Sequence, residues 1–183
     1  KLAAEPGFYP LLDIGCGPGN QLRRLAANRR SADAPCVGLD INPKALAYAA
    51  SRGPEAVFVR GEATALPFRS GGFRAAILSF ALHEQEPEVR RRMLAAAGKV
   101  LGPGGRLILV DFENPWNPVS RLAYGYISII ERIAGRDHFR QNRDFHRRGG
   151  LRALLAENGL VEIRRSDLAA GTCAIVLAVF SAA

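Results

Sequence analysis

Short apolar runs alternate with amphipathic helical stretches along almost the whole chain, and this alternation is the feature that most restricts its fold. Such a rhythm is typical of βαβ units, in which neighbouring strands run parallel. No internal repeat or low-complexity linker interrupts it. The sequence therefore predicts an α/β fold, with a doubly wound and mostly parallel sheet. A length of 183 residues fits one domain, over residues 1–183.

Apolar runs locate the strands, and periodicity with end signals locates the helices. The predicted strands are Tyr9–Ile14, Cys36–Asp40, Ala56–Arg60, Arg74–Phe80, Arg106–Asp111, Leu160–Ser166 and Thr172–Phe180. The predicted helices are Asn20–Arg30, Pro43–Gly53, Glu86–Leu101, Val119–Ala134 and one that follows Gly150 and runs through Glu157. Asn42 is expected to cap the helix that begins at Pro43, and residues 102–105 to end the helix Glu86–Leu101 before the fifth strand.

Charge and cysteine content restrict the partners and the environment. The formal net charge of +8 attracts nucleic acid or an anionic lipid surface, so both nucleic acid and peripheral membrane contact are considered as partners. Nearly all of that charge is Arg, which genomic base composition produces as readily as selection for binding. Cys16, Cys36 and Cys173 lie far apart without a Cys-x-x-Cys pair, so we expect no metal site and a reducing, cytoplasmic location.

Neither end of the chain predicts a targeting or membrane segment. Residues 1–10 lack the apolar core of a signal peptide. The uncharged stretch Leu168–Ala183 is shorter than the roughly 20 apolar residues of a membrane-spanning helix. We therefore expect no transmembrane segment.

A glycine cluster between the first predicted strand and the first predicted helix carries the strongest chemical signal. In the run Leu-Leu-Asp-Ile-Gly-Cys-Gly-Pro-Gly, the glycines at Gly15, Gly17 and Gly19 let the backbone approach a ligand at the carboxyl edge of the sheet. Asn20 stands where a dinucleotide-binding loop has its last glycine, so the spacing disfavours NAD. Asp13 would receive an ammonium group and repel a pyrophosphate.

Acidic residues follow the next two predicted strands. Asp40 lies about 20 residues beyond the glycine loop, where a carboxylate accepts both hydroxyls of a ribose. Ile41 is placed to cover an adenine face, and Glu62 to accept a hydrogen bond from the adenine amino group. These positions predict a nucleoside at the sheet edge.

These motifs, with Ala-Ile-Leu-Ser-Phe-Ala-Leu-His-Glu at 76–84 and Val-Leu-Gly-Pro-Gly-Gly-Arg-Leu at 100–107, resemble the class I S-adenosylmethionine-dependent methyltransferases. The similarity is to the small-molecule branch that includes the quinone-biosynthesis C-methyltransferases, and it covers Leu11–Asp111. It implies a Rossmann-like sheet of seven strands with an antiparallel last strand. It also implies S-adenosylmethionine as cofactor, S-adenosylhomocysteine as product, and a small hydrophobic or aromatic methyl acceptor.

The resemblance also implies the cofactor-binding residues. In chain order these are Asp13, Gly15, Cys16, Gly17, Gly19, Asp40, Ile41, Glu62, Ala63 and Ser79. Cys16 would meet the ligand only through its backbone, and Ser79 would offer its carbonyl oxygen to the ammonium group of the cofactor. Glu62 stands where the family most often has Asp, and the helices that usually precede the first strand are absent from this sequence.

His83 is the candidate catalytic residue. It follows the fourth predicted strand, where the resemblance places the meeting of cofactor and acceptor. Methyl transfer needs alignment and exclusion of water, and a base assists when the acceptor must lose a proton. A loop histidine that shapes the pocket floor is the other interpretation of His83. Residues 112–148 are expected to form a lid-like insertion, in which Val119–Ala134 either covers the acceptor or packs on the sheet.

Several alternatives stay open. The Arg-rich segment Arg132–Arg152, which also holds aromatic side chains, is typical either of a solvated face or of an RNA/DNA methyltransferase that binds nucleic acid there. His138 and His146 within it lack the carboxylates of a metal triad. The Glu-Asn-Pro-Trp run at 113–116 is similar to an amino-methylating motif but follows the wrong strand. A non-catalytic S-adenosylmethionine-binding protein and a nicotinamide dehydrogenase are the remaining alternatives.

Overall fold

The structure, a computed structural model, describes residues 7–28, 35–114, 118–120, 122, 124 and 136–181. Its strands are β1 (Leu11–Ile14), β2 (Cys36–Asp40), β3 (Val57–Arg60), β4 (Phe73–Ser79), β5 (Leu101–Phe112), β6 (Leu160–Leu168) and β7 (Cys173–Phe180). Its helices are α1 (Asn20–Ala27), α2 (Pro43–Ser51), α3 (Pro87–Val100), α5 (Arg136–Arg147), α6 (Gly150–Glu157) and the short 3-10 helix η2 (Ala169–Gly171). The strands form a seven-stranded sheet in the order β3-β2-β1-β4-β5-β7-β6.

The described residues belong to two compact units. The first unit comprises those of Lys1–Ser79 and Arg92–Ile108, and the second those of Phe80–Arg91 and Leu109–Ala183.

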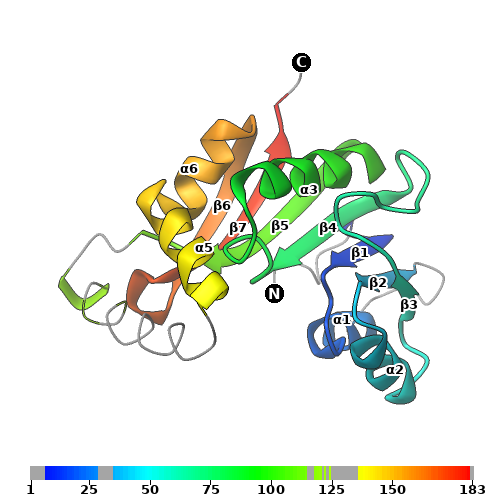
Figure 1. The fold of residues 1–183 in the computed structure, drawn as a ribbon. Helices are drawn as coiled ribbons and strands as arrows, with labels where there is room; N and C mark the ends of the chain where they lie inside the picture. The colour runs from blue at the N-terminus through cyan, green and yellow to red at the C-terminus, as the bar shows by residue number, and fades with distance from the viewer. Residues whose placement is uncertain are drawn as a thin grey trace. The chain divides into compact units, whose positions relative to one another are not determined.

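In the first unit, parallel pairing brings the carboxyl ends of four strands to one edge. β1 pairs in parallel with both β2 and β4, and β3 pairs in parallel with β2. All four residues of β1 are buried, Asp13 included, as expected for a strand inside a parallel sheet with strands on both sides. Helices α1 and α2 pack beside β2 and β3 (Figure 1). Every loop that follows one of these strands therefore starts at the same edge of the sheet.

The start of α2 confirms the expected cap. The Asn42 side chain accepts hydrogen bonds from the backbone N–H groups of Lys44 and Ala45, and Pro43 occupies the first turn, where a missing N–H costs nothing. This local signal places the loop between β2 and α2, which carries Ile41.

In the second unit, β6 and β7 are antiparallel, and α5 and α6 pack together with α6 against β6 (Figure 1). The helix α6 buries Leu151, Leu154 and Leu155 on one face. Phe145 of α5 is one of the largest fully buried side chains. A hydrophobic interior thus holds α5 in place.

The fold class is confirmed, since the sheet is mostly parallel and its last pair is antiparallel. Residues 102–105 were expected to precede the fifth strand, and the predicted strand start at Arg106 is wrong, because β5 already begins at Leu101, directly after α3. Gly104 has a φ of 69°, which glycine adopts without strain. The chain can therefore bend at Gly104 while the strand β5 continues on both sides of it.

The helix α5 was not predicted. Its sequence is rich in Arg and shows no clear apolar stripe, yet one face of the helix is buried. That face carries Asn142, Phe145 and His146. The lid helix predicted at Val119–Ala134 lies mostly outside the described residues and stays a prediction, as does the organisation in one domain.

No described helix has both the length and the apolar character needed to cross a membrane. Within the same part of the chain, no group of three or more His, Cys, Asp or Glu side chains is arranged to hold a metal ion.

Candidate functional site

The loop after β1 depends on glycine backbone geometry. Gly15, Gly17 and Gly19 have φ values of 74°, 52° and 71°, which other residues rarely adopt. A Cβ atom at Gly19 would lie 2.7 Å from the ring of Phe58, whereas one at Gly17 would meet nothing within 4 Å. The backbone at Gly17 therefore faces open space in which a ligand can approach it closely.

Asp40 joins this loop to the end of β2. Its Oδ2 atom accepts the Gly17 N–H at 2.7 Å, and its Oδ1 atom accepts the Asn42 N–H at 2.8 Å. A carboxylate has about four acceptor sites, so each oxygen can still accept a ligand hydroxyl. The position fits the ribose role that the resemblance implies.

Asp13 is a buried acid beside a second acid. It is 2% exposed, and the structure shows no hydrogen bond or ion pair to its carboxyl group from the described residues. Burial, and then the charge of Asp40, raise its pKa to about 7. A bound cation would favour ionisation of this carboxyl group. The electrostatics therefore fit the positively charged cofactor.

The Cys16 thiol is held in its protonated form. Burial, and then the charges of Asp13 and Asp40, raise the pKa of its thiol to about 12. A Cβ atom on Gly38 would lie 2.7 Å from its Sγ atom, so the side chain points toward β2. A neutral thiol in this position is no nucleophile.

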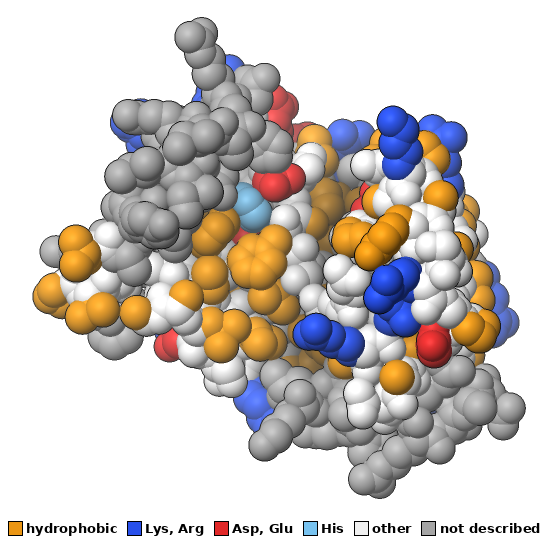
Figure 2. Space-filling view, turned by 90° about the horizontal axis from the view of Figure 1, so that it is seen from below, with side chains coloured by type: hydrophobic (Ala, Val, Ile, Leu, Met, Phe, Trp, Pro, Cys, Tyr) orange, Lys and Arg blue, Asp and Glu red, His pale blue; other side chains and the backbone are white. Residues whose placement is uncertain are grey.

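The remaining predicted cofactor residues lie after the other strands of the first unit. Ile41 is 62% exposed. Figure 2 shows that hydrophobic side chains do reach the surface, next to Lys and Arg side chains. Glu62 is exposed, while Ala63 and Ser79 are partly buried. Parallel pairing therefore brings these positions to the same edge as Asp13 and the glycine loop.

In the second unit, His83 is held by Asp111. The Nδ1 atom of His83 lies 2.8 Å from Oδ1 of Asp111, and the two residues are 4% and 0% exposed. The backbone N–H groups of Leu82, His83 and Phe112 also donate to the Asp111 carboxyl group. A carboxylate at Nδ1 favours the tautomer in which Nδ1 carries the proton and Nε2 is the basic nitrogen. Nε2 itself lies 3.7 Å from Oε1 of Glu84.

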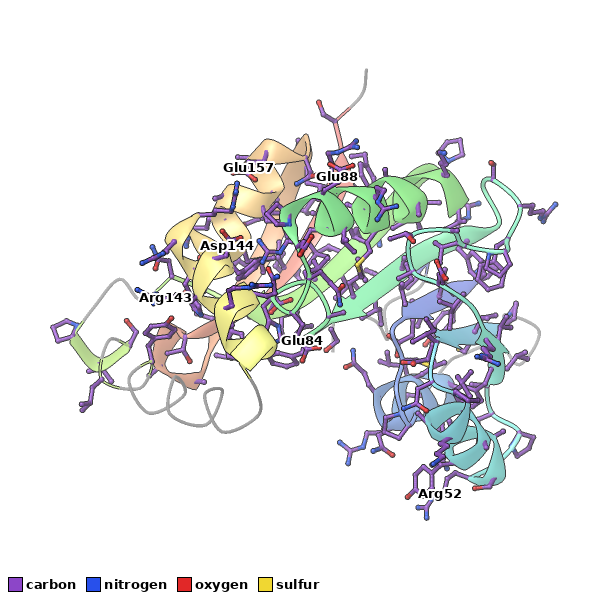
Figure 3. The ribbon with its side chains drawn as sticks, in the orientation of Figure 1. Arg52, Glu84, Glu88, Arg143, Asp144 and Glu157 are labelled. Atoms are coloured by element: carbon purple, nitrogen blue, oxygen red, sulfur yellow. The ribbon has the colours of Figure 1, made fainter. Side chains whose placement is uncertain are left out.

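A buried arginine fixes the same loop to α5. Arg90, 2% exposed, donates to the carbonyl oxygens of Leu82 at 2.9 Å and Gln141 at 3.1 Å. It also donates to the carboxyl group of Asp144 at 3.2 Å, and Asp144 lies on α5 in Figure 3. Leu82, just before His83, is therefore held at both backbone groups: its N–H donates to Asp111 and its carbonyl oxygen accepts from Arg90.

Sequence reasoning missed Asp111 as a partner of His83. The available signal was its position, since Asp111 follows the apolar run of the fifth strand much as Asp40 ends the second. No sequence pattern shows that the two residues, 28 positions apart, meet.

The Arg-rich segment Arg132–Arg152 contains both buried aromatic side chains and exposed arginines. Phe145 and His146 are 2% and 5% exposed, whereas Arg143, Arg147 and Arg148 are exposed. In nucleic-acid sites, nucleobases stack on exposed aromatic side chains. The rings of Phe145 and His146 are buried and are not exposed for such stacking. The described part of the segment presents a charged outer face.

Known proteins resemble this chain in sequence and in fold. Residues 11–105 match the family model described as "Methyltransferase domain". The chain is 40% identical over 117 residues to the uncharacterized methyltransferase sll0829 of Synechocystis sp., covering 64% of this chain and 53% of that protein. It is 31% identical over 186 residues to the demethylmenaquinone methyltransferase of Beutenbergia cavernae, covering 95% and 74% respectively.

A solved S-adenosylmethionine dependent methyltransferase from Mesorhizobium loti has the same fold. It aligns with a TM-score of 0.66 and 17% identity, covering 97% of this chain and 94% of that chain. The chain spans about half the length of the first of its curated relatives, at 53%. Because the family model covers more than half of its 183 residues, the chain belongs to the class I S-adenosylmethionine-dependent methyltransferases.

Proposed function

We propose that this methyltransferase acts on a small hydroxylated aromatic acceptor of the quinol type. The observation that carries the cofactor half of the proposal is the Asp13 carboxyl group, buried beside Asp40 without a protein cation among the described residues. The acceptor half is supported by the name of the Beutenbergia cavernae relative, a demethylmenaquinone methyltransferase.

The cofactor-binding roles follow from the first unit. Asp13 and the loop through Gly17 bind the methionine part, Asp40 binds the ribose hydroxyls, and Ile41 with Ala63 contacts the adenine ring. Glu62 binds the adenine amino group, and the carbonyl oxygen of Ser79 accepts from the ammonium group. The open space at Gly17 and the spare lone pairs of Asp40 support these roles.

His83 acts as the general base. When bound, S-adenosylmethionine supplies an electrophilic methyl group and leaves as S-adenosylhomocysteine. As the acceptor carbon bonds to the methyl group, Nε2 of His83 takes the proton that the acceptor hydroxyl loses. Asp111, 2.8 Å from Nδ1, orients the ring and stabilises the imidazolium that forms. The conjugated ring carries the electron pair of the broken O–H bond to the reacting carbon. Loss of the hydrogen on that carbon to water, with return of a proton to the oxygen, then restores the aromatic ring and the hydroxyl group.

A labelled-methyl acceptor screen tests the proposal. The panel contains quinols, simple phenols, amines, lipids and transfer RNA, each at low and high salt. We expect transfer to quinols, with little dependence on salt. Transfer to RNA that falls steeply with salt would replace this function by the nucleic-acid alternative. Tight S-adenosylhomocysteine binding with transfer to no acceptor would overturn it in favour of a non-catalytic role.

A further inference from the structure

Two polar side chains on α5 are buried without a hydrogen-bond partner among the described residues. His146 is 5% exposed, and neither of its ring nitrogens has a partner. Asn142 is 3% exposed, and its Oδ1 atom has none either. The two residues are four positions apart and therefore share one face of the helix. Buried polar atoms are nearly always paired, so two orphans on one face indicate groups that a ligand satisfies.

Aromatic rings contact His146 on this face. The His146 ring centroid lies 4.3 Å from that of Tyr124 and 5.8 Å from that of Phe112. Phe112 in turn lies 4.7 Å from the ring of His83 and 5.7 Å from the ring of Phe80. His146 therefore belongs to the same aromatic cluster as the proposed base, and all of these residues are in the second unit.

His146 is neutral near pH 7. Burial, and then the neighbouring His83, lower its pKa to about 4, while Asp111 acts in the opposite direction. A neutral imidazole has one nitrogen that donates and one that accepts a hydrogen bond. It therefore suits a hydroxyl or carbonyl group rather than an anion, which would need a charged partner.

We infer that His146 and Asn142 bind the methyl acceptor, by hydrogen bonds to the oxygen substituents of an aromatic ring that packs against Phe112. A purely apolar ligand would leave both groups unpaired, and a hydroxylated ring satisfies them while matching the surrounding rings. This inference rests on the proposed function and adds the residues that select a hydroxylated acceptor.

The test uses the variants His146→Phe and Asn142→Leu with two probes, 1,4-dihydroxynaphthalene handled anaerobically and its 1,4-dimethoxy analogue. Each variant should raise KM for the dihydroxy probe about tenfold, and kcat and S-adenosylhomocysteine affinity should stay within about twofold. The dimethoxy analogue should inhibit the native chain and both variants equally. The melting temperature should not fall, because an apolar side chain of similar shape removes an unsatisfied buried group.

A second pair of variants makes the result specific. His146→Gln keeps a hydrogen-bonding side chain and should recover part of the affinity that His146→Phe loses. Arg143→Gln changes an exposed residue of the same helix, labelled in Figure 3, and should leave KM unchanged.

The outcomes separate the inference from the proposed function. If the native chain methylates the dihydroxy probe and His146→Phe and Asn142→Leu keep its KM, the inference is overturned while the proposed function stands. The same holds if these two variants lose melting temperature and KM stays unchanged, since the side chains are then purely structural. If the native chain methylates no hydroxylated ring, the proposed function itself is overturned, and the inference with it.

Discussion

Asp40, at the end of β2, raises the pKa of Asp13 on the neighbouring strand β1, and burial of Asp13 adds the larger part of the effect. Two acids therefore face one edge of the sheet, and one of them is nearly excluded from water. This arrangement destabilises the ligand-free chain and favours a cationic ligand.

The first prediction concerns how stability depends on pH. The pKa of Asp13 is about 7 in the folded chain, above the ordinary aspartate value of 3.8, so the folded state holds the proton more tightly. The stability that this proton contributes is complete below about pH 4 and is lost as the pH rises to about 7. Urea unfolding of the ligand-free protein should show Asp13→Asn becoming progressively more stable than the native chain over this window.

A bound cation provides the control. With S-adenosylmethionine present at saturation, Asp13 is ionised in the complex, so the native chain should bind more tightly at pH 8 than at pH 5, and Asp13→Asn should lose this pH dependence. A stability difference between the ligand-free proteins that does not vary from pH 4 to pH 8 would refute the raised pKa.

The second prediction concerns Asp40. Asp40→Ala should weaken S-adenosylhomocysteine binding by about 1–3 kcal/mol, because the ribose hydroxyls lose a charged acceptor and the Gly17 N–H loses its partner. Calorimetric titration measures the change. Glu157→Ala, which removes an exposed acid at the end of α6, serves as the matched control and should bind like the native chain. An unchanged Kd for Asp40→Ala contradicts the ribose role.

The third prediction tests whether His83 acts as a general base or only shapes the floor of the pocket. His83→Gln should lower kcat about 10²- to 10⁴-fold, the usual contribution of general acid–base catalysis, with S-adenosylhomocysteine affinity intact. Asp111→Asn should also lower kcat and shift its pH profile, because the amide disturbs the tautomer in which Nδ1 carries the proton and Nε2 is unprotonated. Single-turnover methyl transfer reports both effects. If His83→Gln turns over like the native chain, the base role is wrong.

The fourth prediction concerns a buried ion pair in the second unit. Arg165 donates to Glu113 at 2.6 Å, and the side chains are 9% and 2% exposed. Arg165→Met should destabilise the chain by about 3 kcal/mol, since it removes the main partner of a buried carboxylate. Guanidinium unfolding checks the loss, and Arg164→Met, at the exposed neighbouring position, should cost far less. Equal stabilities of the two variants would show that Glu113 does not depend on Arg165.

Local patterns predicted a large part of the cofactor edge. An apolar run that ends in glycines predicts a strand followed by a tight loop, and β1 with its three positive-φ glycines has that geometry. Asn42 followed by Pro43 predicts a helix start, since both signals act on neighbouring backbone groups. The acid at Asp40 then falls at a strand end because β2 has the predicted bounds.

Contacts between distant parts of the chain could not be predicted in this way. Arg90 and Asp144 are 54 residues apart, and Glu113 and Arg165 are 52 apart. Nothing near either residue in the sequence specifies its partner. The helix α5 was missed for a similar reason, because its charged residues dominate the pattern and only packing shows which face is buried.

The sequence by itself determined the order of strands, glycine loop and helices, since each depends on residues a few positions apart. Only the tertiary structure decided the charge states and pairings. Burial beside Asp40 raises the pKa of Asp13, and the end of β5 brings Asp111 to His83. The physical reason is that desolvation and long-range pairing depend on which surfaces pack together, and this is a property of the whole fold.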